Sequence, residues 1–186
     1  MQISAYTMSD TEILVGMKRS ETQEQAFRAL MSKYQERLYL HIRRMVTEHS
    51  DADDVLQNTL IKIYRGIANF KGNSELYTWL YRIATNESIT FLKRKKRHTS
   101  TSIQNENLDM ENRLKADTWF DGDAAQQKLK AAIAILPQKQ QLVFNMRYYD
   151  DMSYKDISEV LGTSVGALKA SYHHAAKKIE AYIKAN

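Results

Sequence analysis

The chain has 186 residues, of which 43% are hydrophobic and 26% are charged, and this is enough apolar material for a folded core. It contains no cysteine, which excludes disulfide bonds and thiolate metal sites. The formal net charge of +5 favours a polyanionic partner, although many folded proteins are mildly basic. The first residues lack a basic start followed by an apolar run, and no stretch approaches about 20 apolar residues. We therefore expect a cytoplasmic protein.

One proline and six glycines, in a chain rich in helix-forming residues, predict an all-α structure. From Glu24 to Val46 the apolar residues recur every three or four positions, which is typical of one long helix. The following HSDADD segment breaks this pattern, and Ser50 or Asp51 is a suitable cap for a second helix. KGNS, residues 71–74, predicts a turn, and Ser74 can cap a third helix.

This third predicted helix combines aromatic residues with the densest positive charge of the chain. Leu76, Trp79 and Leu80 lie on its apolar side. The other side presents rings, hydroxyls, an amide and cations, from Tyr77, Thr78, Tyr81, Arg82, Thr85, Asn86, Ile89, Thr90 and Lys93. Aromatic rings stack on unpaired bases and cations follow phosphates, so we expect an exposed face that suits single-stranded DNA. Residues 95–97 can alternatively be a solvated helix end.

The segment from Thr99 to Gly122 is polar and acidic and has no sustained periodicity. It predicts a flexible linker between two small helical domains, which we expect over residues 1–98 and 123–186. The second domain begins with the amphipathic stretch DAAQQKLKAAIAIL, and Pro137 is well placed to begin the next helix.

The segment SYKDISEVLGTSVGALKASYHHAAKKIEAYI, residues 153–183, predicts a helix-turn-helix. Its first helix turns Ile157 inward, together with Val160 and Leu161. Gly162 allows a left-handed turn, and Ser164 caps the second helix. The inward side of that second helix is expected to consist of Leu168, Tyr172, Ala175, Ala176, Ile179 and Ile183.

The outward side of the second helix then presents Lys169, His173 and Lys177, with Ala170 and His174 beside them. Such a face suits the major groove of DNA, where long polar side chains contact base edges and lysines contact phosphates. The alternative is an ordinary short helix pair with a glycine turn. Adjacent helical residues point about 100° apart, so the two histidines do not form a joint metal site.

The segment DADDVLQNTLIKIYRGIANFKGNSELYTWLYRIATNESITFLKRKKR, residues 51–97, resembles the second conserved region of bacterial sigma-70 family sigma factors of the extracytoplasmic-function group. Residues 135–183 resemble their fourth region. The two motifs occur in the right order and with the right gap, and together with the long preceding helix they cover nearly the whole chain outside the linker. The resemblance implies a factor that binds core RNA polymerase and directs promoter recognition, DNA melting and transcription initiation. It implies no cofactor and no catalytic residue.

In the second region, the resemblance implies capture of the opened non-template strand at the minus-ten element. Gly72, Asn73, Ser74 and Glu75 would help form the pocket for an extruded base. The strand and its backbone would be contacted by Tyr77, Tyr81, Arg82, Asn86, Lys93, Arg94 and Arg97.

The resemblance also implies that the helix from Asp53 to Ile67 docks on the β′ clamp helices of the polymerase. The polar contacts would come from Asp54, Gln57 and Asn58, with Leu60 and Ile61 as apolar neighbours. Asn58 replaces an acid that is common in the family, so one charge pair is in doubt. A calcium loop is the alternative interpretation of HSDADDVLQN, but the glycine and final glutamate of an EF-hand are absent.

In the fourth region, the resemblance implies contact with the β flap of the polymerase and with duplex DNA at the minus-thirty-five element. The expected DNA contacts are Ser164, Lys169, Ala170, His173, His174 and Lys177. Related proteins often carry arginine where Ser171 and His174 stand, so the preferred sequence cannot be borrowed from them. An anti-sigma factor is a further expected partner, since the family usually has one.

Other functions fit the sequence less well. An enzyme is not expected, because a Gly-rich phosphate loop, a cysteine and a histidine pair at ligand spacing are all absent from the sequence. The alternative function is an autonomous helix-turn-helix regulator. Such a regulator would bind a duplex operator alone, whereas a sigma factor binds promoters well only with core polymerase. A purely protein-binding helical module would leave the basic run unexplained.

Overall fold

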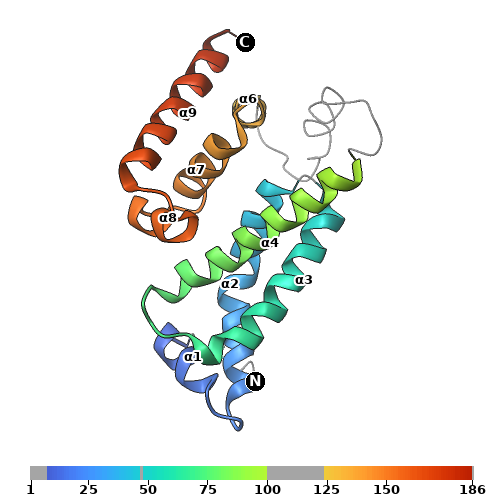
Figure 1. The fold of residues 1–186 in the computed structure, drawn as a ribbon, viewed down its shortest axis with the longest axis vertical. Helices are drawn as coiled ribbons and strands as arrows, with labels where there is room; N and C mark the ends of the chain where they lie inside the picture. The colour runs from blue at the N-terminus through green and yellow to red at the C-terminus, as the bar shows by residue number, and fades with distance from the viewer. Residues whose placement is uncertain (1–7, 47, 100–123, 186) are drawn as a thin grey trace.

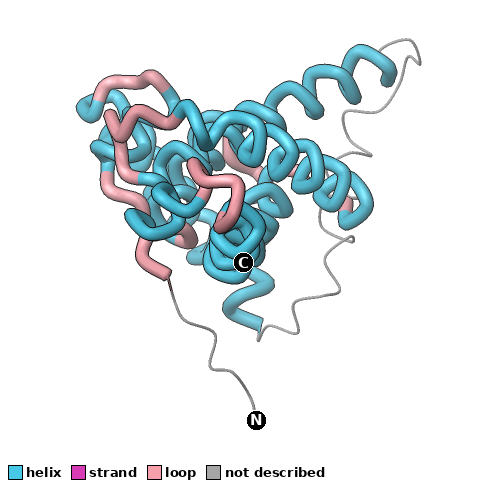
Figure 2. Tube along the Cα trace, turned by 90° about the horizontal axis from the view of Figure 1, so that it is seen from below, coloured by secondary structure: helices cyan, strands magenta, loops and turns pink. Residues whose placement is uncertain are grey.

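The computed structural model describes residues 8–46, 48–99 and 124–185, which form helices connected by short loops (Figures 1 and 2). The first group of elements is α1 (Asp10–Gly16), α2 (Gln23–Met45), α3 (His49–Gly66), the 3-10 helix η1 (Ile67–Asn69) and α4 (Leu76–Thr99). The second group is α6 (Ala124–Ala134), α7 (Gln138–Tyr148), α8 (Tyr154–Leu161) and α9 (Val165–Ala185). The described residues contain no strand, so the predicted all-α fold is confirmed. Among these residues no helix is long and apolar enough to cross a membrane.

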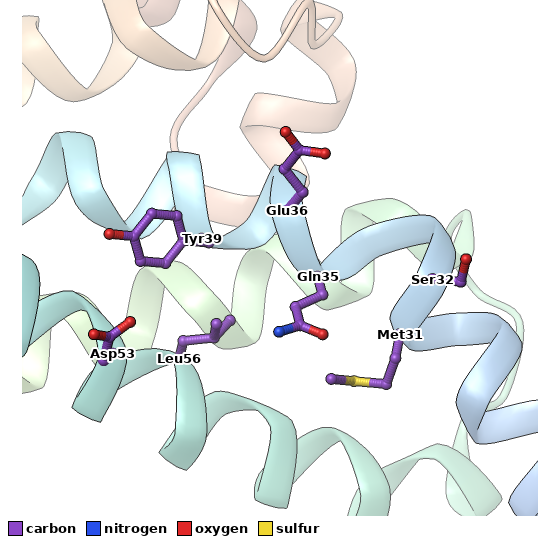
Figure 3. Close-up of a pocket in the computed structure, with 7 residues that line it drawn as sticks. All are labelled: Met31, Ser32, Gln35, Glu36, Tyr39, Asp53 and Leu56. Carbon is purple, nitrogen blue, oxygen red and sulfur yellow. The ribbon is translucent and has the colours of Figure 1, made fainter. Parts of the chain in front are cut away.

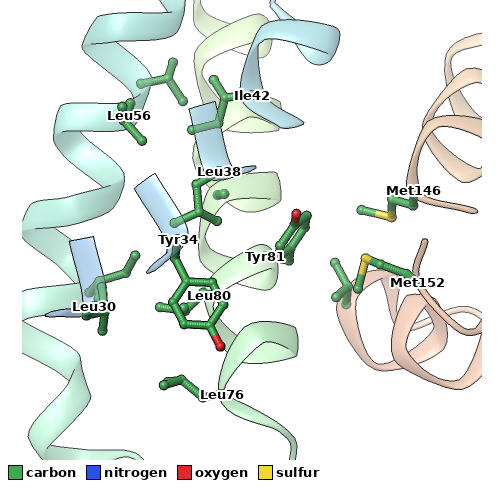
Figure 4. Packing of buried hydrophobic residues seen from close by; sticks show 14 of the residues in the cluster. Leu30, Tyr34, Leu38, Ile42, Leu56, Leu76, Leu80, Tyr81, Met146 and Met152 are labelled. Carbon is green, nitrogen blue, oxygen red and sulfur yellow. The ribbon is translucent and has the colours of Figure 1, made fainter. Parts of the chain in front are cut away.

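The long helices α2, α3 and α4 pack around a shared apolar core (Figure 4). Leu30, Leu38 and Ile42 of α2 are fully buried. They belong to the same buried cluster as Ile63 of α3 and Leu80 of α4. Burying each such side chain stabilises the fold by about 1.5–3 kcal/mol, so this stripe fixes how the three helices face one another. The predicted long helix is confirmed.

The short helix α1 was not expected from the sequence. Ser9 and Glu12 form a capping box, in which the Ser9 hydroxyl accepts from the Glu12 amide and the Glu12 carboxylate accepts from the Ser9 amide. Asp10 then joins α1 to α2, because its carboxylate accepts hydrogen bonds from the Tyr34 hydroxyl at 2.7 and 2.8 Å and from Lys33 at 2.7 Å. These contacts hold α1 against α2.

The helix-turn-helix predicted for residues 153–183 is confirmed. Ser153 and Asp156 form a capping box at the start of α8, and Gly162 adopts a φ of 63° at its end. The Ser164 hydroxyl accepts from the Ala167 amide at 3.4 Å, as expected for a cap of α9. The expected inward position of Ile183 is wrong, because its exposed fraction is 41%: α9 extends beyond the helices that cover its earlier turns.

The two groups of helices are in contact with each other. Tyr81 of α4 faces Met146 and Met152 of the second group, and all three side chains are buried (Figure 4). The predicted linker lies outside the described residues apart from Thr99. The cap predicted for the second helix is wrong, since α3 begins one residue earlier than Ser50 and Glu48 is its N-cap, without a side-chain hydrogen bond.

Candidate functional site

The predicted base pocket is a loop that leads into α4. Gly72 has a φ of 71°, a conformation that glycine adopts without strain, and a Cβ atom there would meet no heavy atom within 4 Å. Asn73 and Glu75 are exposed, whereas Ser74 is half-buried. The structure therefore brings the four predicted pocket residues together on an open loop.

The exposed stripe of α4 follows this loop. Arg82, Asn86 and Thr90 recur every four residues and are exposed, as is Lys93 one turn further on. The Thr90 hydroxyl donates to the backbone carbonyl of Asn86 at 2.7 Å, so the side-chain amide of Asn86 is not used in this bond. The stripe presents an amide and cations to solvent. Arg94 and Arg97 are exposed in the last turns of the helix.

Three residues of the predicted exposed face are instead buried. The exposed fractions are 5% for Tyr81, 2% for Thr78 and 1% for Thr85. The expectation of exposure was wrong because side chains of α2, α7 and α8 cover this part of α4. The Thr78 hydroxyl donates to Asp156 at 3.3 Å, and Thr85 Oγ1 lies 3.0 Å from Nε2 of His41.

Tyr77 is half-buried at the edge of the same contact. Burial, and next the neighbouring Asp156 carboxylate, raise its pKa to about 12. Burial alone would raise the pKa of Asp156, but hydrogen bonds from Ser153, Tyr77 and Thr78 hold it below its ordinary value. Tyr77 is therefore a neutral phenol beside a carboxylate.

Lys95 of the basic run joins α4 to the start of α3. Its ammonium donates to Asp51 at 2.7 Å and to Glu48 at 3.1 Å. Burial lowers the pKa of Lys95, but these two carboxylates raise it overall. Lys93, Arg94 and Lys96 are exposed around it, so positive charge is concentrated at this end of the helix.

The predicted polymerase-docking residues lie on one face of α3. Asp54, Gln57, Asn58 and Ile61 are spaced by three and four residues and are all exposed. The Asn58 amide donates to the backbone carbonyl of Asp54 at 3.0 Å. Leu60 is half-buried and lies at the flank of this stripe. We call Asp54, Gln57, Asn58 and Ile61 the α3 stripe.

A groove between α2 and α3 was not predicted from the sequence (Figure 3). Its lining residues are Met31, Ser32, Gln35, Glu36, Tyr39, Asp53 and Leu56. Met31, Gln35 and Tyr39 recur every four residues, a signal that marks one face of α2. Nothing in the sequence says which helix that face meets.

The outward face of α9 agrees with the prediction. Lys169, His173 and Lys177 are exposed, whereas Leu168 and Ala175 are buried. The remaining predicted contacts are also exposed: Ser164, Ala170 and His174. Within the described ranges no group of three metal-ligating side chains is close enough to hold an ion. The outward face of α9 therefore presents lysine ammonium groups and histidine rings to solvent.

Comparison with known proteins decides the family. The sigma-70 region 2 model matches residues 30–98, and the sigma-70 region 4 model matches residues 126–179. An extracytoplasmic-function sigma-E factor of Haemophilus influenzae is 30% identical over 165 residues, which cover 84% of this chain and 87% of that protein. The chain belongs to the extracytoplasmic-function group of the sigma-70 family. It is an RNA polymerase sigma factor, a class of protein that directs transcription initiation.

Further relatives of this sigma factor agree. The RNA polymerase sigma-H factor of Pseudomonas aeruginosa is 28% identical over 188 residues, which cover 92% of each chain. The sigma factor RpoE of Bartonella quintana, solved in complex with the anti-sigma factor NepR, has a similar fold, with a TM-score of 0.70 and 20% identity over 86% of this chain and 98% of that one. CnrH, solved with the cytosolic domain of CnrY, has a TM-score of 0.68 and 19% identity over 95% and 99% of the two chains.

Proposed function

We propose that this sigma factor uses three separate exposed faces for three tasks. The loop before α4 and the exposed stripe of α4 bind the opened minus-ten strand, α9 binds the minus-thirty-five duplex, and the α3 stripe docks on core RNA polymerase. The observation that carries the proposal is that each face is exposed and has the chemistry of its partner. The domain boundaries near residues 98 and 123 belong to the same proposal.

The minus-ten face combines an open loop with an amide and cations. A flipped base costs a few kcal/mol of unstacking, and contacts to the opened strand must offset this cost. Gly72 and Asn73 lie on the loop, and Asn86 offers both a donor and an acceptor to a base edge. Lys93 and Arg94 are exposed at the end of the helix, where they can bind the phosphates of the same strand.

The minus-thirty-five face is the outward side of α9. Lys169 and Lys177 supply phosphate contacts, and His173 between them is placed to contact a base edge. Ser164 begins the helix, where backbone amides favour a phosphate. Contact of this group of helices with the polymerase β flap belongs to the same proposal.

The α3 stripe supports docking on the β′ clamp helices. Asp54 supplies negative charge, Gln57 and Asn58 supply amides, and Ile61 has an exposed fraction of 42%. Ile61 would add an apolar contact to the polar contacts of the same face. The groove beside it, which Glu36 and Asp53 line, extends the same acidic surface onto α2.

An anti-sigma factor and a cytoplasmic location complete the proposal. The sigma factor of Bartonella quintana and CnrH are both described in complexes, the first with an anti-sigma factor and the second with a cytosolic domain. A cytoplasmic location follows from the proposed partners, because core polymerase and the chromosome lie there.

The test separates a sigma factor from an autonomous regulator. Labelled chain is titrated with core polymerase, and its binding to a duplex DNA pool is measured with and without the polymerase. We expect a stable complex with core polymerase and selective promoter binding only in that complex. Selective binding to duplex DNA by the chain alone, without a complex with the polymerase, would support the regulator instead.

A further inference from the structure

The direction that α9 presents to solvent is fixed by its buried side. Leu168 and Ala175 are 1% and 0% exposed, so the opposite side of the helix points away from the rest of the second group. Because successive helical residues are about 100° apart, Gly166, Ala170 and Lys177 lie close to the centre of that outward side. All three are exposed. The two smallest, Gly166 and Ala170, occupy the first turns of α9, and the lysine follows them.

Gly166 has no reason within the described fold to be a glycine. Its φ is not positive, unlike that of Gly162 in the turn before α9. A Cβ atom at Gly166 would meet no heavy atom within 4 Å. Alanine favours a helix more than glycine does, so the glycine costs the protein some stability and gains no internal contact. A glycine in such a position lets the backbone approach another molecule closely.

The exposed side chains beside Gly166 are apolar. Val165 has an exposed fraction of 37%, and Ala167 and Ala170 are exposed as well. The hydroxyl oxygen of Ser164 already accepts the hydrogen bond from the Ala167 amide that caps the helix. In a helix-turn-helix, the second helix enters the major groove with its N-terminal residues against the base edges. The first turns of α9 therefore offer methyl groups to those edges.

Thymine is the base whose major-groove edge suits such a surface. Its C5 methyl group projects into the groove, and alanine is among the side chains that contact it. Attraction between two methyl groups is lost when they are separated by a further ångström, so the helix must lie close to the bases. Lys169, His173 and Lys177 on the same face can contact phosphates and neighbouring base edges.

We propose that α9 recognises thymine in the minus-thirty-five element through the methyl group of Ala170, and that Gly166 lets the helix approach the bases closely enough for this contact. The inference rests on the proposed binding of α9 to the minus-thirty-five duplex. It names the class of target for this face, which is duplex DNA with thymine where the first turns of α9 lie. The lysines supply affinity that does not depend on sequence, and the two small residues distinguish the bases.

The first test removes single methyl groups from the DNA. Promoter duplexes that bind the complex of this chain with core polymerase are selected from a random pool. Each thymine of the minus-thirty-five element is then replaced by uracil, which lacks only the C5 methyl group and keeps every hydrogen-bonding group. We expect uracil at one or more of these positions to weaken binding roughly fourfold, which corresponds to about 0.8 kcal/mol for one buried methyl group.

A variant that lacks the alanine methyl group completes this test. Ala170→Gly should bind the thymine and uracil duplexes equally. Ala181→Gly changes another exposed alanine of α9, about three turns further along the helix, and should keep the preference for thymine. Equal binding of the two duplexes by the wild-type chain, or an undiminished thymine preference in Ala170→Gly, would overturn the proposal.

The second test separates close approach to DNA from stability. Gly166→Ala should unfold at a temperature no lower than wild type, because the added Cβ meets nothing within 4 Å. The same methyl group should hold α9 away from the bases. We therefore expect the polymerase complex of this variant to bind the selected promoters at least fivefold more weakly and with a smaller thymine preference, while its affinity for core polymerase is unchanged. Unaltered promoter binding, or a loss of polymerase binding instead, would contradict the proposed contact.

These results are distinguishable from a failure of the proposed function. If the chain binds core polymerase and selects promoters but does not distinguish thymine from uracil, the proposed function is supported and thymine recognition by Ala170 is wrong. If the chain forms no complex with core polymerase but alone prefers thymine duplexes, and loses this preference in Ala170→Gly, thymine recognition is supported and the sigma-factor mechanism is wrong.

Discussion

The carboxylate of Asp150 lies 2.7 Å from Nδ1 of His41, although the two residues are 109 positions apart in the chain. This pair joins α2 to the loop after α7, and these two segments belong to different conserved regions of the sigma-factor family. Both side chains are buried, with exposed fractions of 1% and 3%. The burial of Thr85 on α4, which His41 contacts, therefore depends on segments far apart in the chain.

Replacing both Asp54 and Gln57 with alanine should weaken binding to core polymerase. Both side chains lie on the exposed α3 stripe, so the fold should not change. We expect a loss of roughly tenfold or more in affinity, since truncating an important interface residue costs over about 1.4 kcal/mol. The measurement is a titration of labelled chain with core polymerase. The matched control replaces Glu24 and Gln25, an exposed acid and amide on α2, with alanine. Equal affinity of the two double variants for core polymerase would show that the α3 stripe does not dock on it.

Asn86→Ala should impair strand opening more than duplex binding. The side-chain amide is exposed on α4, where it is proposed to bind a base that has left the duplex. We expect permanganate reactivity of promoter thymines to fall roughly tenfold, which corresponds to about 1.4 kcal/mol. Gln25→Ala removes an exposed amide in the first turn of α2 and is the control. Normal melting by the Asn86 variant would show that this residue does not contact the strand.

Exchanging Lys169 and His173, as K169H with H173K, should change the sequence preferred at the minus-thirty-five element. The exchange keeps the composition of the exposed α9 face but moves the longer cation by one turn. A randomised promoter library, sequenced after selection, measures the change. Separately, Lys169→Ala should reduce the slope of log affinity against log salt by about 1. Lys184→Ala, near the end of α9, is the control and should change neither the selected promoter sequence nor the salt slope. An unaltered sequence preference for the exchanged variant would show that this face does not contact the minus-thirty-five element.

Gly16→Ala should destabilise the protein. A Cβ atom at Gly16 would lie 2.7 Å from Cβ of Ala26, so α1 and α2 would have to separate. We expect the free energy of unfolding to fall by about 1–3 kcal/mol, as for other overpacked cores. Gly166→Ala is the control, because a Cβ there meets nothing within 4 Å and alanine favours a helix by up to about 1 kcal/mol. Urea unfolding that gives Gly16→Ala the stability of wild type would show that this contact is not tight.

The ionisation of Tyr77 should report whether the two groups of helices are in contact. Its pKa is raised from 10.0 to about 12, so its neutral form stabilises the contact fully below pH 10, and this stabilisation is lost as the pH rises through about 12. In Asp156→Asn, where the neighbouring negative charge is gone, the pKa should fall towards 10.0. Titration of a ring-labelled Tyr77 by NMR measures this directly. A pKa near 10.0 in the wild-type chain would be inconsistent with the contact.

Local signals predicted much of this fold. The three-and-four spacing of apolar residues predicted α2 and α9, and Gly162 and Ser164 predicted the turn and the cap between α8 and α9. These features depend on residues that are close in sequence. Helix α1 was not predicted, although Ser9 and Glu12 have the spacing of a capping box, because a helix of 7 residues is too short for a sustained apolar stripe.

Contacts between distant segments could not be predicted in the same way. Tyr81 and Thr85 lie on a side of α4 whose composition equally suits solvent, DNA or another helix. Only the packing of α7 and α8 against α2 and α4 shows that they are buried. The groove between α2 and α3 depends in the same way on which helix faces are adjacent.

The most direct test of the account is in vitro transcription of genomic DNA by purified core polymerase, with and without this chain, followed by sequencing of the RNA 5′ ends. We expect new start sites only when the chain is present, preceded by two shared sequence elements at the minus-thirty-five and minus-ten positions. Identical start sites in the two reactions would contradict its action as a sigma factor.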